Sequence, residues 1–349
     1  MRIAVDAMGG DHAPGVVIEG AMQALEESAL SITLVGQEAL LRQEIERLGG
    51  TAGRFTIENA AEVVAMDESP SDALKKKKDS SVRVAFELVR KGKADGAISA
   101  GNSGATLATA GFVLGRLQGV ERPAIAGILP TLKGPTVMID VGANVDCKPH
   151  HLLQFGIMGS VFSQGILGVL KPKVGLLSIG EEGGKGNQLV KKAHKLFSLS
   201  SLNFVGNVEG RDIFKGDIDV IVCDGFVGNI SLKLSEGLAE AVGSMLRAEM
   251  EKTFLAKTGY MLSRKAFKKF ARRVDYAEYG GAPLLGINGI GIIAHGRSCP
   301  RAIKNAILVA AELVSRKVNE HLIANLKDNE DLHALGKREI LCSVHRQAE

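Results

Sequence analysis

Asparagine and glycine recur together in four segments, each of which directly follows a short apolar run. The segments are Gly101-Asn102-Ser103-Gly104, Gly142-Ala143-Asn144-Val145-Asp146, Gly180-Glu181-Glu182-Gly183-Gly184-Lys185-Gly186-Asn187 and Asp224-Gly225-Phe226-Val227-Gly228-Asn229. Glycine lets a backbone approach a ligand closely, while asparagine caps the following helix or donates a neutral hydrogen bond. Any one segment is best explained as a turn or a cap. Four of them at one edge of a sheet would favour a site rich in neutral donors and helix N-termini, which suits phosphate and a developing oxyanion.

The opening segment Met8-Gly9-Gly10-Asp11-His12-Ala13-Pro14 is a further candidate, because it follows the first apolar run directly. Asp11 precedes a predicted helix with Pro14 in its first turn, so capping alone would account for this acid. Capping does not account for the pair Gly9 and Gly10. We therefore keep this segment as a candidate ligand-binding turn.

Several common catalytic motifs are missing from the sequence. It has no Gly-x-x-x-x-Gly-Lys-Ser/Thr nucleotide loop, no His-Glu-x-x-His zinc helix and no Gly-x-Ser-x-Gly nucleophile elbow. A covalent serine or cysteine enzyme is therefore disfavoured. Five histidines are candidates for acid–base chemistry, namely His12, His150, His151, His194 and His295. Only His12 and His295 stand beside glycine-rich turns, and a lone histidine is more often a surface or core residue than a catalyst.

Strand-like and helix-like segments alternate along the chain as far as Cys223. The predicted strands are Arg2–Asp6, Ser31–Gly36, Phe55–Glu58, Ala94–Ser99, Thr136–Val141, Lys173–Ile179, Asn203–Val205 and Asp219–Cys223. This alternation predicts an α/β fold with a mainly parallel, doubly wound sheet and helices on both faces. Such sheets bind ligands beyond the carboxyl ends of their strands, so we expect the glycine–asparagine segments to share one edge.

The C-terminal third has a different pattern. A helical pattern runs from Phe226 to about Thr253, and a basic segment then leads to the glycine-rich run Gly280–Gly296. We expect a helical excursion over 227–274 inside a single domain, 1–326. A long closing helix over Ala302–Asn325 and a polar C-terminal tail over 327–349, to which no role is assigned, complete the expected organisation.

Composition indicates an ordinary globular protein, with 45% hydrophobic and 23% charged residues. The acidic residue Asp6 interrupts the N-terminal apolar run after only a few residues, so the start lacks the apolar stretch of a signal peptide. No apolar run is long enough to span a membrane. We therefore expect a cytoplasmic protein whose membrane contact, if any, is peripheral. Four cysteines without a Cys-x-x-Cys pair, Cys147, Cys223, Cys299 and Cys342, favour reduced thiols over structural zinc or disulfides.

The net charge of +4 is modest, but positive charge is concentrated between Arg264 and Val274. At about 100° per residue, one half of this predicted helix carries only basic residues, and the other half carries Phe267, Phe270, two alanines and Val274. The basic residues are Arg264, Lys265, Lys268, Lys269, Arg272 and Arg273. We expect this helix to face the anionic inner surface of the cell membrane. The alternative is that the phenylalanines pack on the body or on a second copy, while the basic face is solvated or holds an acidic partner.

Five ordered motifs resemble those of the bacterial phosphate acyltransferases that depend on acyl carrier protein. The motifs are Val5–Pro14, Ile98–Ala105, Asp140–Asp146, Lys185–Asn187 and Asp224–Asn229. The resemblance spans roughly Met1 to Asn325 and implies a fold similar to those of isocitrate and isopropylmalate dehydrogenases and of phosphotransacetylase. It also implies transfer of a long-chain fatty acyl group from acyl carrier protein to inorganic phosphate, giving acyl phosphate for glycerolipid synthesis. A homodimer, no cofactor or metal, and delivery to a membrane glycerol-3-phosphate acyltransferase are further implications.

Phosphate is itself a nucleophile, so such an enzyme need only align it with the thioester, stabilise the oxyanion and release the thiol. We expect Lys185, a cation in a glycine-rich loop, to be catalytic. The sequence is equally consistent with Lys185 being an exposed loop lysine without a catalytic role. Asn102 and Asn229 are expected as catalytic neutral donors, and Asp6, Asp11 and Asp224 as residues that orient them. The expected phosphate-binding residues are Gly9, Gly10, Asp11, His12, Gly101, Ser103, Gly104, Asn144, Gly186, Asn187, Asp224 and Gly228.

Three rival functions stay open on the sequence alone. A phosphate acetyltransferase linked to coenzyme A shares the reaction type, and thioester exchange assays would separate it. A metal- and NAD-dependent decarboxylating dehydrogenase is a rival by fold alone, which does not decide function. The run Lys75–Lys78 and the basic segment would suit a nucleic-acid binder, but the sequence has only 4% aromatic residues and no known binding module, so we expect no nucleic-acid partner.

Overall fold

The computed structural model describes residues 1–274, 278–329 and 331, and within them eleven strands form one continuous sheet. The sheet order is β3-β2-β1-β4-β11-β10-β5-β6-β9-β7-β8. The strands are β1 (Arg2–Asp6), β2 (Ser31–Gly36), β3 (Thr56–Asn59), β4 (Gly96–Ser99), β5 (Ala124–Pro130), β6 (Pro135–Ile139), β7 (Lys173–Leu177), β8 (Asn203–Val208), β9 (Val220–Val222), β10 (Ala282–Leu285) and β11 (Gly291–Ile293). The predicted α/β fold with a mainly parallel sheet is confirmed.

The direction of the strands reverses in the middle of the sheet. Three consecutive pairings, β11 with β10, β10 with β5 and β5 with β6, are antiparallel, whereas the pairings on either side are parallel. An odd number of reversals makes β6, β9, β7 and β8 run opposite to β1, β2, β3, β4 and β11. The prediction that all glycine–asparagine segments share one edge is therefore wrong, because it assumed a sheet without this antiparallel centre.

The sequence patterns did not reveal the central strands β5, β10 and β11. Gly127 interrupts the apolar run of β5, and a strand-interior glycine weakens the local signal. Strands β10 and β11 are short and lie inside the glycine-rich run, for which no strand was predicted. Pairing with neighbours distant in sequence, such as Leu284 with Ile125, defines these strands.

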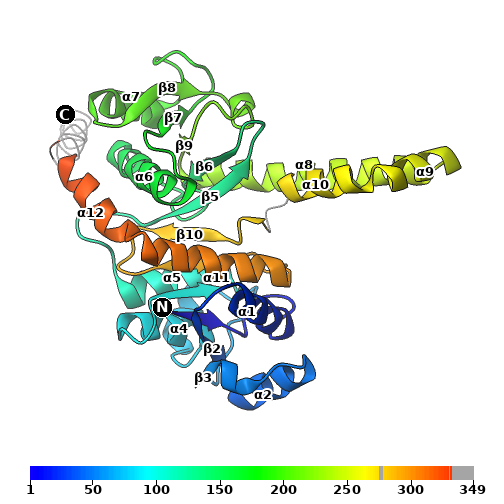
Figure 1. The fold of residues 1–349 in the computed structure, drawn as a ribbon. Coiled ribbons are helices and arrows are strands. Elements are labelled where there is room, and N and C mark those ends of the chain that lie inside the picture. The colour runs from blue at the N-terminus through cyan, green and yellow to red at the C-terminus, as the bar shows by residue number, and fades with distance from the viewer. Residues whose placement is uncertain (275–277, 330, 332–349) are drawn as a thin grey trace.

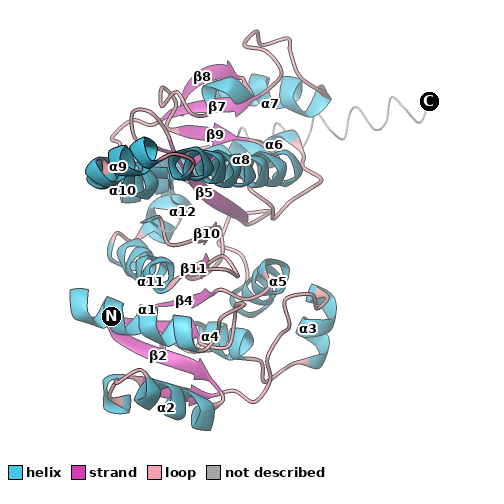
Figure 2. Cartoon of the chain, turned by 90° about the vertical axis from the view of Figure 1, so that its right-hand side faces the viewer, coloured by secondary structure: helices cyan, strands magenta, loops and turns pink. Residues whose placement is uncertain are grey.

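Helices cover both faces of the sheet, as Figure 2 shows with the sheet seen nearly edge-on. They are α1 (Gly15–Glu27), α2 (Glu38–Arg47), α3 (Pro70–Lys76), α4 (Ser81–Arg90), α5 (Ser103–Leu114), α6 (Pro149–Phe162), α7 (Gln188–Leu199), α8 (Gly225–Glu251), α9 (Phe254–Leu262), α10 (Arg264–Val274), α11 (Pro300–Ser315) and α12 (Val318–Asp328). One core contains Ile3 and Val5 with residues of α1, α6, α7, α11 and α12. The other contains Ala4 with residues of α3, α4 and α5, as the alternation of side chains along a strand requires.

The predicted closing helix over Ala302–Asn325 is two helices, so that prediction is wrong. Lys317 has a left-handed φ of 52°, which ends α11 and redirects the chain into α12. Helix α12 runs to Asp328, so the first residues of the tail predicted for 327–349 are helical. Residues 330 and 332–349 of that tail lie outside the described residues.

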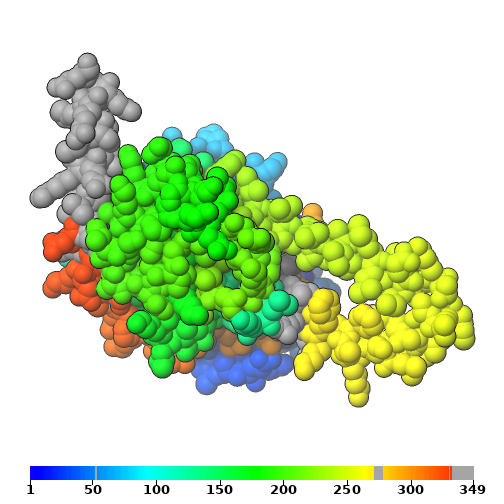
Figure 3. Space-filling model, turned by 90° about the horizontal axis from the view of Figure 1, so that it is seen from above, coloured from blue at the N-terminus to red at the C-terminus, as the bar shows by residue number. Residues whose placement is uncertain are grey.

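Helices α8, α9 and α10 form an arm that projects from the body, in the place predicted for the helical excursion (Figures 1 and 3). Apolar side chains on α8 are exposed at intervals of three or four residues. They are Ile230, Leu234, Leu238, Val242 and Met245, whose exposed fractions range from 51% to 70%. Among the described helices, including these three, none is long and apolar enough to cross a membrane.

Candidate active site

A cleft of about 310 Å³ lies where the two halves of the sheet meet. It is lined by Ile125 and Gly127 of β5, by the segments that follow β4, β6 and β11, and by one face of α8. The segments after β4 and β6 both line this cleft, although their strands run in opposite directions. The antiparallel centre of the sheet therefore forms part of the cleft wall.

Six polar side chains line this cleft, two of which are Glu236 and Tyr279. Ser103 is the first residue of α5, and Asn229 lies near the N-terminus of α8. Lys233 follows Asn229 by four residues and so lies on the same helix face, where its Nζ contacts Glu236 Oε2 at 2.8 Å. His295 enters from the segment after β11. A hydroxyl, an amide, a cation and an imidazole beside helix N-termini can together bind an oxyanion.

His295 lines the cleft as a neutral imidazole. Burial lowers the pKa of its imidazole below the usual value, and the nearby Lys233 charge lowers this pKa further, so the ring is neutral at neutral pH. Its Nδ1 accepts the backbone N–H of Arg297 at 3.1 Å. The proton of the neutral ring is therefore on Nε2.

Asp140 organises the cleft wall after β6. Its Oδ1 accepts the backbone N–H groups of Ile125, Gly142 and Ala143 at 3.0, 3.2 and 3.0 Å. Its Oδ2 accepts the backbone N–H and the side-chain amide of Asn144 at 2.7 and 2.9 Å. Burial raises the pKa of this carboxyl, and the hydrogen bonds oppose that effect. Because every contact donates a proton to it, Asp140 serves as an ionised acceptor that fixes this turn.

Asp6 has a similar role at the end of β1. Its carboxylate accepts the Ser99 hydroxyl at 2.6 Å and the backbone N–H of Met8 at 3.2 Å, and burial raises its pKa. A Cβ on Gly9 would lie 2.7 Å from both Asp6 Oδ2 and the Gly101 nitrogen. The Gly101 N–H itself donates to Ser99 Oγ at 3.1 Å. Close packing around Asp6 thus explains Gly9 and Gly101.

Most of the predicted asparagine donors are engaged within the protein. The Asn102 amide donates to the carbonyls of Met66 and Glu68, both at 2.9 Å, and its Oδ1 caps α5 by accepting Ala105 N–H. Asn187 caps α7. Besides its contact with Asp140, Asn144 donates to the Pro123 carbonyl at 2.8 Å. Of these predicted asparagines, Asn229 is the one that lines the cleft.

Replacing Asn102 and Asn229 with alanine separately is expected to have different effects. Asn102→Ala should lower the free energy of unfolding by about 0.5–2 kcal/mol, because it removes a helix cap, and leave the KM for phosphate unchanged. Asn229→Ala should raise that KM or lower kcat with little change in stability. Chemical denaturation and steady-state kinetics of both variants would measure this, and a catalytic defect confined to Asn102→Ala would contradict the assignment.

Two other predicted residues support α8. Asp224 caps this helix by accepting the N–H groups of Phe226 and Val227 at 3.0 and 2.9 Å. A Cβ on Gly228 would lie only 1.9 Å from the Asp140 carbonyl oxygen, so only glycine lets α8 pack here. Both residues therefore help to hold the start of α8 in place, and with it Asn229 and Lys233.

The opening segment lies beside the loop after β11. Asp11 N–H donates to the Gly296 carbonyl at 2.9 Å, while Asp11 and His12 have exposed side chains. The prediction that Asp11 caps the first helix is wrong, because α1 begins at Gly15 after Pro14 without a side-chain cap. Gly10, with φ of 110°, makes the turn that brings Asp11 to this loop. Gly104, another predicted phosphate-binding residue, packs against Pro70.

Lys185 is exposed on the loop between β7 and α7, where its N–H donates to the Glu182 carbonyl at 2.9 Å. Gly186, with φ of 99°, turns the chain into the Asn187 cap. Among the described residues that line the cleft there is none from this loop. The predicted catalytic role of Lys185 stays a prediction.

Sequence reasoning missed Lys233, Glu236 and Asp140, and it considered His295 without assigning it a role. The spacing of Asn229 and Lys233 was a usable signal, because residues four apart share a helix face. His295 also had a signal, since it stands next to Gly296 in the glycine-rich run. Asp140 stands in a quoted motif, but only the fold shows that five donors converge on it.

Glu121, His150 and His151 form a cluster whose potential ligand atoms lie within 4.8 Å of one another. Both imidazole Nε2 atoms contact Glu121 Oε2, at 2.8 and 3.2 Å. Burial lowers the pKa of His151 to about 4, and its Nδ1 accepts the Lys148 N–H at 3.0 Å. The Nε2 atom of His151 therefore carries the proton and donates it to Glu121. A metal would have to displace this proton, so the geometry favours a hydrogen-bonded cluster.

Solved structures with this architecture include phosphotransacetylases. The chain is similar to a phosphotransacetylase from Streptococcus pyogenes with a TM-score of 0.62 and 18% identity, covering 90% of this chain and 94% of the other. A branched-chain phosphotransacylase from Enterococcus faecalis V583 gives a TM-score of 0.57 at 13% identity, with 90% and 99% covered. Identities this low show that the fold is shared.

Closer relatives are found among curated sequences. A family model described as "Fatty acid synthesis protein" matches residues 1–321. A phosphate acyltransferase of Pelobacter propionicus is 57% identical over 329 residues, which cover 94% of this chain and 95% of the relative. Another from Geotalea daltonii is 55% identical over 333 residues, covering 95% and 96%. The chain therefore belongs to the bacterial phosphate acyltransferase family.

Proposed function

We propose that this protein transfers a long-chain fatty acyl group from acyl carrier protein to inorganic phosphate, giving acyl phosphate for glycerolipid synthesis. Family membership supports acyl transfer to phosphate. The observation that carries the proposal is the convergence of Ser103, Asn229, Lys233 and His295 on one cleft. This set can hold phosphate with a cation and neutral donors, without a covalent enzyme intermediate.

In this mechanism a phosphate oxygen attacks the thioester carbonyl carbon directly. Asn229 holds the phosphate near the N-terminus of α8, and the Lys233 ammonium stabilises the oxyanion of the tetrahedral intermediate. Collapse of the intermediate breaks the C–S bond, and the released thiolate takes up a proton. Phosphate supplies the nucleophile and the protein supplies position and charge stabilisation.

Incubation of the purified protein with palmitoyl-acyl carrier protein and phosphate tests this proposal. We expect free carrier thiol and hydroxylamine-reactive acyl phosphate to form in equal amounts, and only when phosphate is present. Acetyl-coenzyme A and palmitoyl-coenzyme A serve as comparison donors. Turnover of acetyl-coenzyme A with no turnover of the carrier thioester would overturn the proposal in favour of a phosphate acetyltransferase.

The arm supports two further parts of the proposal, a homodimer and peripheral attachment at the inner membrane surface, where a glycerol-3-phosphate acyltransferase would use the product. The exposed apolar row on α8 is suited to pack against a second copy. Helix α10 carries Arg264, Lys265, Lys268 and Lys269, and the side chains of Arg272 and Arg273 lie outside the described ones. Phe270 is 57% exposed, while Phe267 stacks on Tyr260 with ring centroids 5.1 Å apart.

Liposome flotation tests the membrane attachment. Wild type should float with anionic liposomes and not with neutral ones, because each exposed cation contributes about 1 kcal/mol near an anionic leaflet. The double variant Phe267→Asp, Phe270→Asp should lose flotation. A matched double variant on the body, Phe112→Asp with Leu170→Asp, replaces side chains that are 61% and 95% exposed and should float like wild type. Equal flotation of wild type and arm variant would exclude this attachment.

Nucleic acid is not a proposed partner. Within the run Lys75–Lys78, Lys76 pairs with Asp72 at 3.3 Å and Lys77 pairs with Glu68 at 2.6 Å. Local carboxylates thus neutralise half of this run, which leaves little excess charge for a phosphate backbone.

A further inference from the structure

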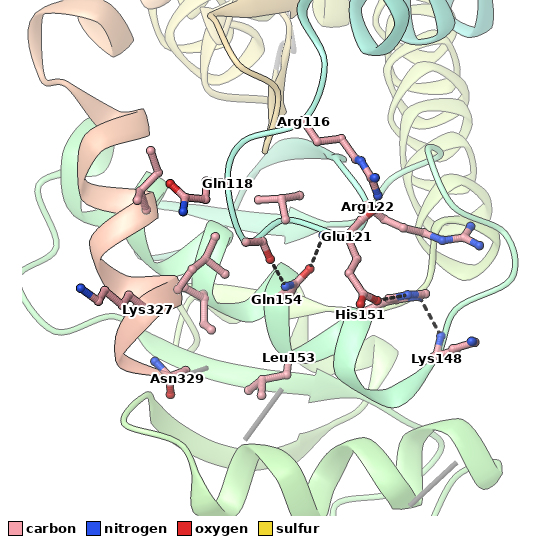
Figure 4. Close-up of a pocket in the computed structure, with 15 residues that line it drawn as sticks. Arg116, Gln118, Glu121, Arg122, Lys148, His151, Leu153, Gln154, Lys327 and Asn329 are labelled. Carbon is pink, nitrogen blue, oxygen red and sulfur yellow. Dashed lines mark hydrogen bonds and ion pairs between the residues drawn. The ribbon is translucent and has the colours of Figure 1, made fainter. Parts of the chain in front are cut away.

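A second large hollow, of about 870 Å³, shares no lining residue with the cleft, and Figure 4 shows the residues that line it. Its walls are the 116–122 segment after α5, the N-terminal half of α6 and the end of α12. We call this hollow the α6–α12 pocket. The proposed acyl transfer gives it no role.

Cations dominate the rim of the α6–α12 pocket. Arg116, Arg122, Lys148 and Lys327 line it and are exposed. Across the described residues, no carboxylate forms an ion pair with any of these four side chains. Glu121, the acid among the described lining residues, is instead held by the two imidazoles. The pocket therefore presents a concentrated positive charge to a partner.

The segment that carries these cations is held in place. The side-chain amide of Gln154 donates to the Gly119 carbonyl at 2.7 Å, and its oxygen accepts the Glu121 N–H at 3.0 Å, as Figure 4 shows. Arg116 donates to the Glu121 carbonyl at 2.5 Å. The lining also includes Ile323, whose side chain is exposed. Exposed cations beside an exposed apolar side chain suit a protein surface that is mainly acidic.

The pocket is linked to the cleft through two short stretches of chain. Arg122 leads through Pro123 directly into β5, whose Ile125 lines the cleft. On the other wall, Lys148 follows the turn that contains the cleft residue Gly142. The hydrogen bond from Asn144 to the Pro123 carbonyl, at 2.8 Å, joins these stretches. A partner bound at the α6–α12 pocket is thereby placed beside the cleft.

We propose that the α6–α12 pocket docks the acidic carrier protein that presents the thioester to the cleft. This inference rests on the proposed function, and it names the surface that recognises the donor. Charge complementarity and the short link to the cleft favour this pocket over the basic face of α10, which lies on the projecting arm. Complementary charge of this kind acts chiefly on encounter, so it should appear in KM and in salt dependence.

The test compares charge-reversal variants on two donors with the same acyl chain, palmitoyl-acyl carrier protein and palmitoyl-pantetheine. The pocket variant is Arg122→Glu with Lys148→Glu. The matched control, Lys191→Glu with Lys195→Glu, reverses two exposed cations on α7. A third variant, Lys265→Glu with Lys269→Glu, reverses charge on the arm. Thermal unfolding checks each fold, and Arg122→Gln with Lys148→Gln replaces the pocket variant if the reversal impairs folding.

We expect the pocket variant to raise KM for the carrier thioester about tenfold and to flatten its dependence on NaCl, with pantetheine kinetics unchanged. The α7 control should match wild type on both donors. An unchanged carrier KM in the pocket variant, or a rise confined to the arm variant, would overturn the docking site while leaving the proposed function in place. If wild type does not use the carrier thioester at all, the proposed function fails first.

Discussion

Lys233→Ala is expected to lower kcat for acyl phosphate formation by about 10²- to 10³-fold, the usual cost of removing one donor that stabilises a developing oxyanion. Lys233 lines the cleft on the same face of α8 as Asn229, and its side chain is 51% exposed. The substitution therefore removes charge at the site without opening the core. Steady-state kinetics with the carrier thioester and phosphate, combined with thermal unfolding, measures the effect. Lys233→Arg, which keeps the charge, should restore part of the activity.

Lys185→Ala is the informative comparison, because the sequence pointed to this lysine as the catalytic cation. Lys185 is exposed on a loop that contributes no residue to the described cleft lining, so we expect its loss to change kcat much less. A large loss in Lys185→Ala with near-normal turnover in Lys233→Ala would reverse this assignment. That result would show that the loop after β7 reaches the substrate during the reaction.

Asp140→Ala is expected to lower the free energy of unfolding by on the order of 3 kcal/mol or more. The substitution removes the acceptor for five N–H groups, and each buried donor left unpaired costs about 1–3 kcal/mol. Activity should fall with stability, because the same turn forms the cleft wall at Gly142. Urea denaturation followed by circular dichroism gives the free energy.

Asp146→Ala is the matched control for this measurement. Asp146 belongs to the same motif but is exposed, so its loss should leave stability within about 0.5 kcal/mol of wild type. Asp140→Asn should fall between the two, because an amide keeps one oxygen acceptor and turns an N–H₂ group toward the remaining donors. Equal stability of Asp140→Ala and Asp146→Ala would mean that water replaces the carboxylate and that Asp140 does not organise the turn.

The sequence alone was sufficient for the alternating part of the fold. The strands at Arg2–Asp6 and Ser31–Gly36 were predicted with their observed bounds, because a buried parallel strand is a continuous apolar run with clear turn residues after it. The helical arm was recognisable for a similar reason, since its periodicity is local. The five motifs were enough to recognise the family, because each is a contiguous stretch of sequence and the order of the five along the chain can be read directly.

Only the tertiary structure decided where the chemistry is assembled. The short central strands β10 and β11 are defined by pairing with strands far away in sequence, and with β5 they reverse the direction of the sheet. Segments after strands of opposite direction, β4 and β6, then line the same cleft. Asn102 and Asn229 look alike in sequence, yet the first is held by Met66 and Glu68 and the second lines the cleft. A side chain's free hydrogen-bonding capacity depends on neighbours that only the packed chain brings to it, and local sequence does not contain that information.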